Sequence, residues 1–251
     1  MKLLFLGVSA AFSVGDNNFQ SNMLIESDSG YKLLIDCGSD ARHSLFAEGY
    51  TFSDIDAVYI SHLHSDHCGG LEWLGFSKNF IDGQKTKLLI SYDQADRLWN
   101  NVLSGGMCSI EDKQANLASF FNVKTIHNRF IWENYRFQLV KTIHSISNGE
   151  IMPSYGLLIT TKSQKIFLST DTRFSPDSLQ PIYDRADIIF HDCETSEKWS
   201  GQHAHYKELK TLDSKTRGKM WLYDYNCGPL PDAKKDGFRG FLVRGQSFNF
   251  N

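Results

Sequence analysis

Residues 62–67 have the sequence His-Leu-His-Ser-Asp-His, which places four potential metal ligands within six positions. An apolar stretch shortly before this segment predicts a strand, so the ligands would lie in a tight loop where that strand ends. Four ligands this close in sequence do not all fit one tetrahedral ion without strain. We therefore expect His62 and His64 to bind one metal and Asp66 and His67 to face a second. Two adjacent metals are typical of a hydrolytic site.

The composition predicts one ordinary globular domain over residues 1–251. The chain is 41% hydrophobic and 22% charged, and none of its apolar runs approaches the roughly 20 residues that cross a bilayer. The apolar start of the sequence is too short for a signal peptide. Its five cysteines are odd in number and form no C-x-x-C pair, which favours a reducing compartment. We expect a cytoplasmic protein without a membrane partner.

The formal net charge of −3 argues against binding of a long nucleic acid, because that binding depends on many positive side chains. A small anionic substrate is still compatible with this charge, since bound metals supply positive potential locally.

Six predicted strands each end in a side chain that can bind a metal or carry a proton. These residues are Asp36, His62, His144, Asp171, His191 and Asp224. If the strands lie side by side, these side chains converge on one edge of a sheet. Helical patterns at residues 41–48, 93–103, 110–120 and 206–212 make the chain a mixed α/β (α+β) protein, with an order too irregular for a Rossmann or TIM fold.

Taken together, these motifs resemble those of the metallo-β-lactamase superfamily. The similarity begins at residues 62–67, continues through His144 and Asp171, and reaches the position of the last ligand at Asp224. Within the superfamily the chain is most similar to the ribonuclease Z-like branch of phosphodiesterases, which includes tRNA 3′-processing enzymes and enzymes that degrade cyclic nucleotides. The resemblance implies an αββα four-layer sandwich, in which two sheets pack face to face with helices outside.

The resemblance also implies a role for each ligand. The first metal would be held by His62, His64 and His144, the second by Asp66, His67 and Asp224, and Asp171 would bridge both. Asp36 would orient a ligand imidazole through a hydrogen bond. Relatives of this type often form dimers, so a homodimer is expected on resemblance alone.

Two departures from the branch bear on function. The last ligand is normally histidine, and Asp224 stands there instead. The sequence leaves three interpretations open: Asp224 is a native ligand, it indicates a weakly bound second metal, or it is an engineered change. Transfer-RNA processors also carry a long basic arm with glycine and proline, which residues 73–134 do not show. This second departure argues against a tRNA substrate.

Further histidines are candidates for proton transfer. In the ribonuclease Z-like branch, a histidine just before residues 206–212 protonates the leaving group; His205 fits that position best and His203 is the second candidate. The alternative is that both lie on the surface at a helix start. Asp66 is a further candidate catalytic carboxylate. His191 would support a ligand, with structural packing an equal alternative.

The sequence thus predicts a hydrolase that depends on two divalent ions, with Zn²⁺ expected and Mn²⁺ or Fe as alternatives. The leading hypothesis is a phosphodiesterase for a small nucleotide or cyclic nucleotide, in which hydroxide between the metals attacks phosphorus. Four aromatic side chains are candidates to stack on a base, with packing as the alternative: Trp73, Phe76, Tyr155 and Trp199. Other hypotheses are hydrolysis of a carbon ester, thioester, lactone or lactam on the same metals, and a metal-poor binding relative.

Overall fold

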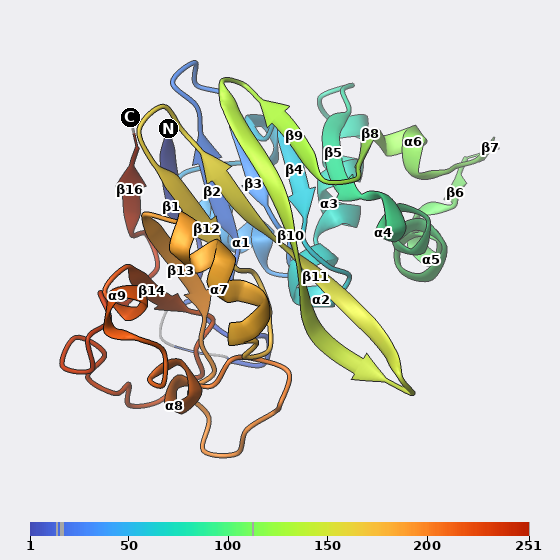
Figure 1. The fold of residues 1–251 in the computed structure, drawn as a ribbon. Helices are drawn as coiled ribbons and strands as arrows, with labels where there is room; N and C mark the ends of the chain where they lie inside the picture. Colours follow the sequence, from blue (N-terminus) through green and yellow to red (C-terminus); the bar gives the residue numbers. More distant parts are fainter. Residues whose placement is uncertain (14, 16–17, 112, 251) are drawn as a thin grey trace.

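Two seven-stranded sheets dominate the structure, a computed structural model that describes residues 1–13, 15, 18–111 and 113–250 (Figure 1). In sheet 1 the strands follow one another in the order β16 (Ser247–Asn249), β1 (Lys2–Phe5), β2 (Met23–Glu26), β3 (Lys32–Ile35), β4 (Ala57–Ile60), β5 (Thr86–Ser91) and β8 (Phe121–Ile126). In sheet 2 the order is β15 (Gly240–Phe241), β14 (Met220–Tyr223), β13 (Ile188–Asp192), β12 (Lys165–Leu168), β11 (Glu150–Thr160), β10 (Tyr135–Ser147) and β9 (Arg129–Trp132).

Short helices connect and cover these strands. The α-helices are α1 (Ala41–Ala47), α2 (Ser65–Cys68), α3 (Leu71–Phe80), α4 (Tyr92–Arg97), α5 (Ser104–Met107), α6 (Leu117–Phe120), α7 (Pro176–Arg185), α8 (Tyr206–Leu209) and α9 (Ser214–Arg217). A 3₁₀ turn, η1, spans Phe52–Asp54, and a π-helical segment, η2, spans Leu98–Leu103. A small hairpin pairs β6 (Ser109–Ile110) with β7 (Lys113–Gln114).

Three apolar clusters define the layers of the molecule. One lies between the sheets and joins Tyr59 of β4 to Phe190 of β13. A second packs the outer face of sheet 1 against Leu45 of α1 and Leu74 of α3, and a third packs the outer face of sheet 2 against Leu179 of α7. Figure 1 shows α7 on its sheet. All four residues of β4 are buried because both faces of its sheet are covered. This arrangement is the predicted αββα sandwich.

The strand directions bring several carboxyl ends to one edge. β3, β4, β5 and β8 are parallel neighbours in sheet 1, and β12, β13 and β14 are parallel neighbours in sheet 2. β10 runs parallel to β12, because both are antiparallel to the β11 strand between them. The residues that follow β3, β4, β12 and β14, together with His144 near the end of β10, lie close together at one edge of the sandwich.

The two sheets are joined at this edge by hydrogen bonds between β4 and β11. The Tyr59 hydroxyl donates to the Tyr155 carbonyl at 2.7 Å, and the Tyr155 amide donates to the Ser61 carbonyl at 3.1 Å. Both tyrosines are buried. These bonds fix the end of β4 against sheet 2, directly before the motif at residues 62–67.

One expectation about secondary structure is wrong. Among the described residues of the predicted helix at 110–120, Ile110, Lys113 and Gln114 belong to β6 and β7, and the helical part is Leu117–Phe120. Four residues are too few for an independent helix, so contacts with the neighbouring β8 and α3 decide this region. Among the residues described, no helix is long and apolar enough to cross a membrane.

Truncation of the inter-sheet core should destabilise the whole sandwich. Phe137 is 1% exposed and stacks on Phe130 with ring centroids 4.6 Å apart. We expect Phe137→Ala to lower the free energy of unfolding by about 3–5 kcal/mol in urea denaturation. Phe46→Ala is the matched control, because Phe46 is 78% exposed on α1, and it should change stability by less than about 0.5 kcal/mol. Equal effects of both substitutions would contradict this description of the core.

Candidate metal centre

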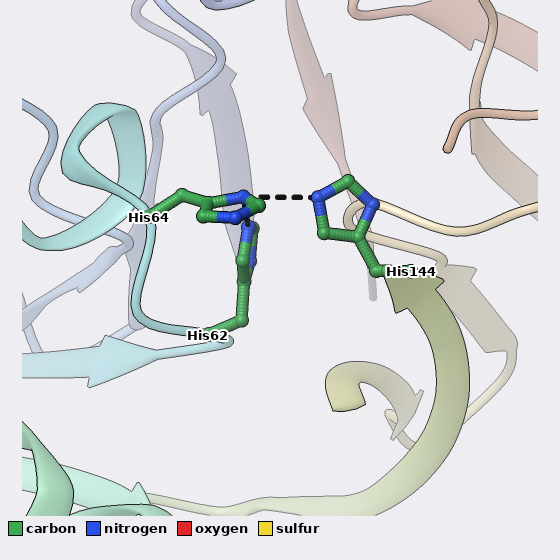
Figure 2. A group of neighbouring side chains, drawn as sticks. All are labelled: His62, His64 and His144. Atoms are coloured by element: carbon green, nitrogen blue, oxygen red, sulfur yellow. Dashed lines mark hydrogen bonds between the residues drawn. The ribbon is translucent and has the colours of Figure 1, made fainter. Parts of the chain in front are cut away.

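Three histidine rings from both sheets converge at the edge described above (Figure 2). His62 and His64 follow β4, and His144 lies on β10 opposite them. His64 Nδ1 is 3.1 Å from His62 Nε2 and 3.0 Å from His144 Nε2. Three imidazole nitrogens bound to one tetrahedral Zn²⁺ lie about 3.3 Å apart, so the rings already have nearly the spacing of a three-histidine metal site.

Hydrogen bonds on the far side of the rings determine which nitrogens carry protons. Ser61 Oγ donates to Asp36 and therefore accepts from His62 Nδ1 at 3.1 Å, while His144 Nδ1 donates to the Gln202 carbonyl at 3.0 Å. The Nε2 atoms of His62 and His144 then carry no proton, and their lone pairs face His64. A single proton on His64 Nδ1 satisfies only one of them, whereas a cation among the three nitrogens satisfies all.

His67 is held between three carboxylates. Its Nδ1 donates to Asp36 Oδ2 at 2.7 Å, and its Nε2 lies 3.1 Å from Asp66 Oδ2 and 3.2 Å from Asp171 Oδ1. Asp36 also accepts hydrogen bonds from the amide and hydroxyl of Ser61. Asp36 thereby orients His67 in the way that buried carboxylates orient metal-binding imidazoles.

Asp171 lies at the centre of the arrangement. Its Oδ2 is 3.7 Å from His62 Nε2 and 3.6 Å from His144 Nε2, while its Oδ1 faces His67. Asp171 thus belongs to three of the four groups of potential ligands in the described chain. One carboxylate with an oxygen toward each side has the geometry of a bridge between two ions.

A further group brings Asp192, His203 and Asp224 next to Asp171. His203 Nδ1 is 2.9 Å from Asp192 Oδ2, 3.5 Å from Asp224 Oδ2 and 3.9 Å from Asp171 Oδ2. The other oxygen of Asp224 accepts a 2.6 Å hydrogen bond from the Ser21 hydroxyl. The His203 side chain, which comes from a loop, therefore lies beside Asp224.

Backbone strain concentrates at this edge. Asp36, Thr170 and Asp224 have φ angles of 61°, 51° and 62°. This left-handed region is costly for residues other than glycine, above all for a β-branched residue such as threonine. Each of these residues directly follows a strand or precedes a central ligand, so the strain accompanies the placement of the carboxylates.

Burial determines how the site ionises. Burial lowers the pKa of His144 to about 4 and that of His62 well below its usual value, which favours the neutral rings that bind metals. Burial and the charge of Asp171 raise the pKa of Asp224 well above its usual range, and burial raises that of Asp192 to about 6. A nearby divalent cation favours the ionised form of such carboxylates.

Charge outweighs burial at His67, His203 and Asp171. Burial opposes ionisation at each of them. The pKa of His67 is nevertheless held well above its usual value by Asp171, Asp66 and Asp36, and that of His203 by Asp192 first. The charge of His67 in turn holds the pKa of Asp171 well below its usual range.

Several buried polar atoms fit a bound cation. His67 Nε2, Asp171 Oδ1 and Asp192 Oδ1 have no hydrogen-bond partner among the described residues. Buried polar atoms in proteins are normally hydrogen-bonded, so His67 Nε2 and Asp171 Oδ1, which face one another at 3.2 Å, fit a shared bound cation. Nitrogen and oxygen donors of this kind suit Zn²⁺, and Mn²⁺ or Fe as well.

Two predicted histidines lie outside these ligand groups. His205 Nδ1 accepts from the Lys207 amide, so its Nε2 donates to the Ser196 carbonyl at 3.0 Å, and its ring stacks on Trp199. His191 donates from Nδ1 to the Asp192 carbonyl and accepts from the Tyr183 hydroxyl, and burial lowers its pKa to about 4. Both rings are thus occupied by other partners.

Sequence reasoning did not find every residue that supports the site. The Gln202 carbonyl and the Ser61 hydroxyl orient ligand rings, but a backbone carbonyl and a lone serine leave no motif in a sequence. The contact of Asp192 with His203 was also not predicted. The position of Asp192 at the end of β13, the same signal that marked Asp171, is the one that pointed to it.

A small cavity of about 180 Å³ adjoins the second group of ligands. Its walls include Phe12, Gln202, His203 and Asp224. Phe12 is 99% exposed. The cavity therefore offers an apolar ring at its rim and potential ligands in its wall.

Comparison with solved structures gives the fold family. The metallo-β-lactamase fold protein YhfI from Bacillus subtilis superimposes with a TM-score of 0.76 at 19% identity, covering 98% of both chains. The short form of human tRNase Z gives 0.69 at 18% identity over 99% of both chains. The predicted metallo-β-lactamase fold is confirmed.

Comparison with sequences is more specific. A relative from Paenibacillus harenae, the anti-Pycsar protein Apyc1, is 36% identical over 230 residues, which is 90% of each chain. The model of the family described as anti-Pycsar protein Apyc1 matches residues 1–248. The chain therefore belongs to the anti-Pycsar protein Apyc1 family.

Proposed function

We propose that the chain is a phosphodiesterase that depends on two divalent metal ions and hydrolyses a small nucleotide, most specifically a cyclic nucleotide. The observation that carries the proposal is the buried Asp171 carboxylate, which has ligand groups on both of its sides. Membership of a family named for opposing Pycsar and the metallo-β-lactamase fold support the same class of reaction.

We assign the ligands to the two ions as the resemblance implies. The first ion would be held by His62, His64 and His144, and the second by Asp66, His67 and Asp224, with Asp171 between them. When bound, such ions lower the pKa of water toward neutrality and neutralise charge on phosphate oxygens.

The protein itself holds a proton where the leaving oxygen would depart. His203 donates from Nδ1 to Asp192, so its Nε2 is the atom that can carry a transferable proton. This ring forms part of the cavity wall and lies 3.9 Å from Asp171. His205 has both nitrogens engaged by backbone groups. The geometry therefore favours His203 over His205 as the general acid.

The same cavity suggests how a base is recognised. The four aromatic candidates from the sequence are engaged elsewhere: Trp73 packs on Phe52, Phe76 on Phe120, Trp199 on His205, and the Tyr155 hydroxyl donates to Asp93. Phe12 is not packed in this way, because its side chain is exposed, and it lines the same cavity as His203. We assign Phe12 the role of stacking on the base.

Two alternative functions also have a basis in particular residues. Hydrolysis of a carbon ester, thioester or lactone would use the same ions but has less need of the Asp192–His203 pair. A metal-poor binding protein would follow if the aspartate at position 224 fails to hold an ion. A homodimer stays a prediction from resemblance.

Direct assay tests the function. The Zn²⁺- or Mn²⁺-loaded chain should convert a 3′,5′-cyclic nucleotide to a nucleoside monophosphate and should leave a panel of lactones unchanged. Chromatography measures the product of each reaction. Asp171→Asn should abolish turnover because it removes the shared charge. Turnover of lactones without turnover of any phosphodiester would overturn the proposal.

Metal analysis tests the ligand assignment. After loading with Zn²⁺ and desalting, we expect about two ions per chain by elemental analysis. Asp171→Ala should retain clearly fewer, with circular dichroism to check folding. His43→Ala is the control, because His43 is exposed and outside the ligand groups, and it should match the wild type. Fewer than about one ion in the wild type would favour the binding relative.

Comparison of leaving groups tests the acid. His203→Ala should lower kcat for a cyclic nucleotide by roughly 10²–10⁴-fold, because an alkoxide needs a proton to depart. It should affect bis(p-nitrophenyl) phosphate much less, since nitrophenolate leaves unprotonated. His205→Ala is the comparison variant and should have a smaller effect on the cyclic substrate. Equal losses on both substrates for His203→Ala would rule out the acid role.

A further inference from the structure

A second cavity, far from the metal centre, gathers positive charge. It has a volume of about 680 Å³ and is lined by five cationic side chains: Lys124, Arg129, Arg136, Lys165 and Arg185. We call it the basic groove. Its volume lies within the usual range for small-molecule sites, roughly 300–1,000 Å³. The chain as a whole is acidic, with a net charge of −3, so this concentration of cations is local.

The strand register places three of these side chains, Arg129, Arg136 and Lys165, on one face of sheet 2, while Lys124 comes from β8 of sheet 1 and Arg185 from α7. Arg136 of β10 pairs with Ile131 of β9 on one side and Thr160 of β11 on the other, and Thr160 pairs with Lys165 of β12. Side chains in such a row point to the same face of a sheet. Arg129 lies two residues before Ile131 and shares that face. The groove is therefore built on paired strands rather than on a loop.

The cations of the groove are not neutralised by the protein. Within the part of the chain that is described, none of the five forms an ion pair. Arg185 donates to the Gln138 amide oxygen at 3.2 Å, which positions it but leaves its charge unpaired. Asp187 accepts from the backbone amide of Lys165. Five uncompensated charges around one cavity create a strong field for an anion.

The floor of the groove is apolar. Leu158 lines the groove and is 1% exposed, and Ile131, which pairs with Arg136 across β9 and β10, is 65% exposed. Arginine side chains bind phosphate groups through two parallel hydrogen bonds, and an apolar floor accepts a flat organic group. We propose that the basic groove is a binding site for a polyphosphate anion of nucleotide size.

This site is separate from the metal centre. Arg136 and His144 are eight residues apart on β10, which corresponds to about 26 Å along a strand. In Figure 1 the β9–β10 turn lies at the end of the sandwich opposite α2, which contains Asp66 and His67. The proposal therefore does not depend on the proposed hydrolytic function.

Titration calorimetry on the chain freed of metal by a chelating resin tests the site. We expect inorganic tripolyphosphate and ATP each to bind once per chain, with affinity that falls as salt is added. Arg129→Gln/Arg136→Gln should weaken both by at least tenfold. Tighter binding of ATP would identify a nucleoside polyphosphate as the ligand, and equal binding an inorganic polyphosphate.

A matched pair of substitutions controls for net charge. Lys215→Gln/Lys235→Gln removes two exposed positive charges outside the groove and should leave both affinities unchanged. Asp171→Asn should also leave them unchanged, which separates this site from the metal centre. No binding by the wild type, or an equal loss in the groove variant and the charge control, would overturn the proposal.

Discussion

Four buried carboxylates at one edge of the sandwich are the constraint on which the site depends. Asp36, Asp171, Asp192 and Asp224 are each at most 2% exposed. An isolated buried carboxylate costs several kcal/mol, so each must find a positive partner or hydrogen-bond donors. His67 serves Asp36 and Asp171, and His203 serves Asp192. Most of the polar contacts at this edge follow from that need.

The fold meets the constraint by bringing two sheets together at their carboxyl ends. The carboxylates come from β3 in sheet 1 and from β12, β13 and β14 in sheet 2, so neither sheet alone holds the complete set. The hydrogen bonds of Tyr59 and Ser61 with Tyr155 fix the two edges against each other. The rigid strands then hold Asp36, Thr170 and Asp224 in left-handed backbone conformations that would otherwise relax.

Most of the residues at this edge could be predicted from the sequence, because a polar side chain after an apolar run indicates a residue near the end of a strand. That signal located Asp36, His144, Asp171 and Asp224 before their strands were known to be neighbours. The helix expected at residues 110–120 failed because its pattern was short and tertiary contacts decided its structure. His203 was only the second candidate acid, and its contacts with Asp192 and Asp224 could not be predicted, because it lies in a loop whose path depends on the whole fold.

The exchange at position 224 connects these points. The ribonuclease Z-like branch has an imidazole there, whereas this chain places a third buried carboxyl group beside Asp171 and Asp192, and burial together with the charge of Asp171 raises the pKa of Asp224 well above its usual range. A buried carboxyl group without polar partners is costly. His203 Nδ1 lies 3.5 Å from Asp224 and 2.9 Å from Asp192, so an imidazole missing from the strand end is supplied by the loop. His203 thus lies near both carboxyl groups, and the Ser21 hydroxyl donates to the other oxygen of Asp224, so the buried carboxyl at position 224 has polar neighbours on both sides.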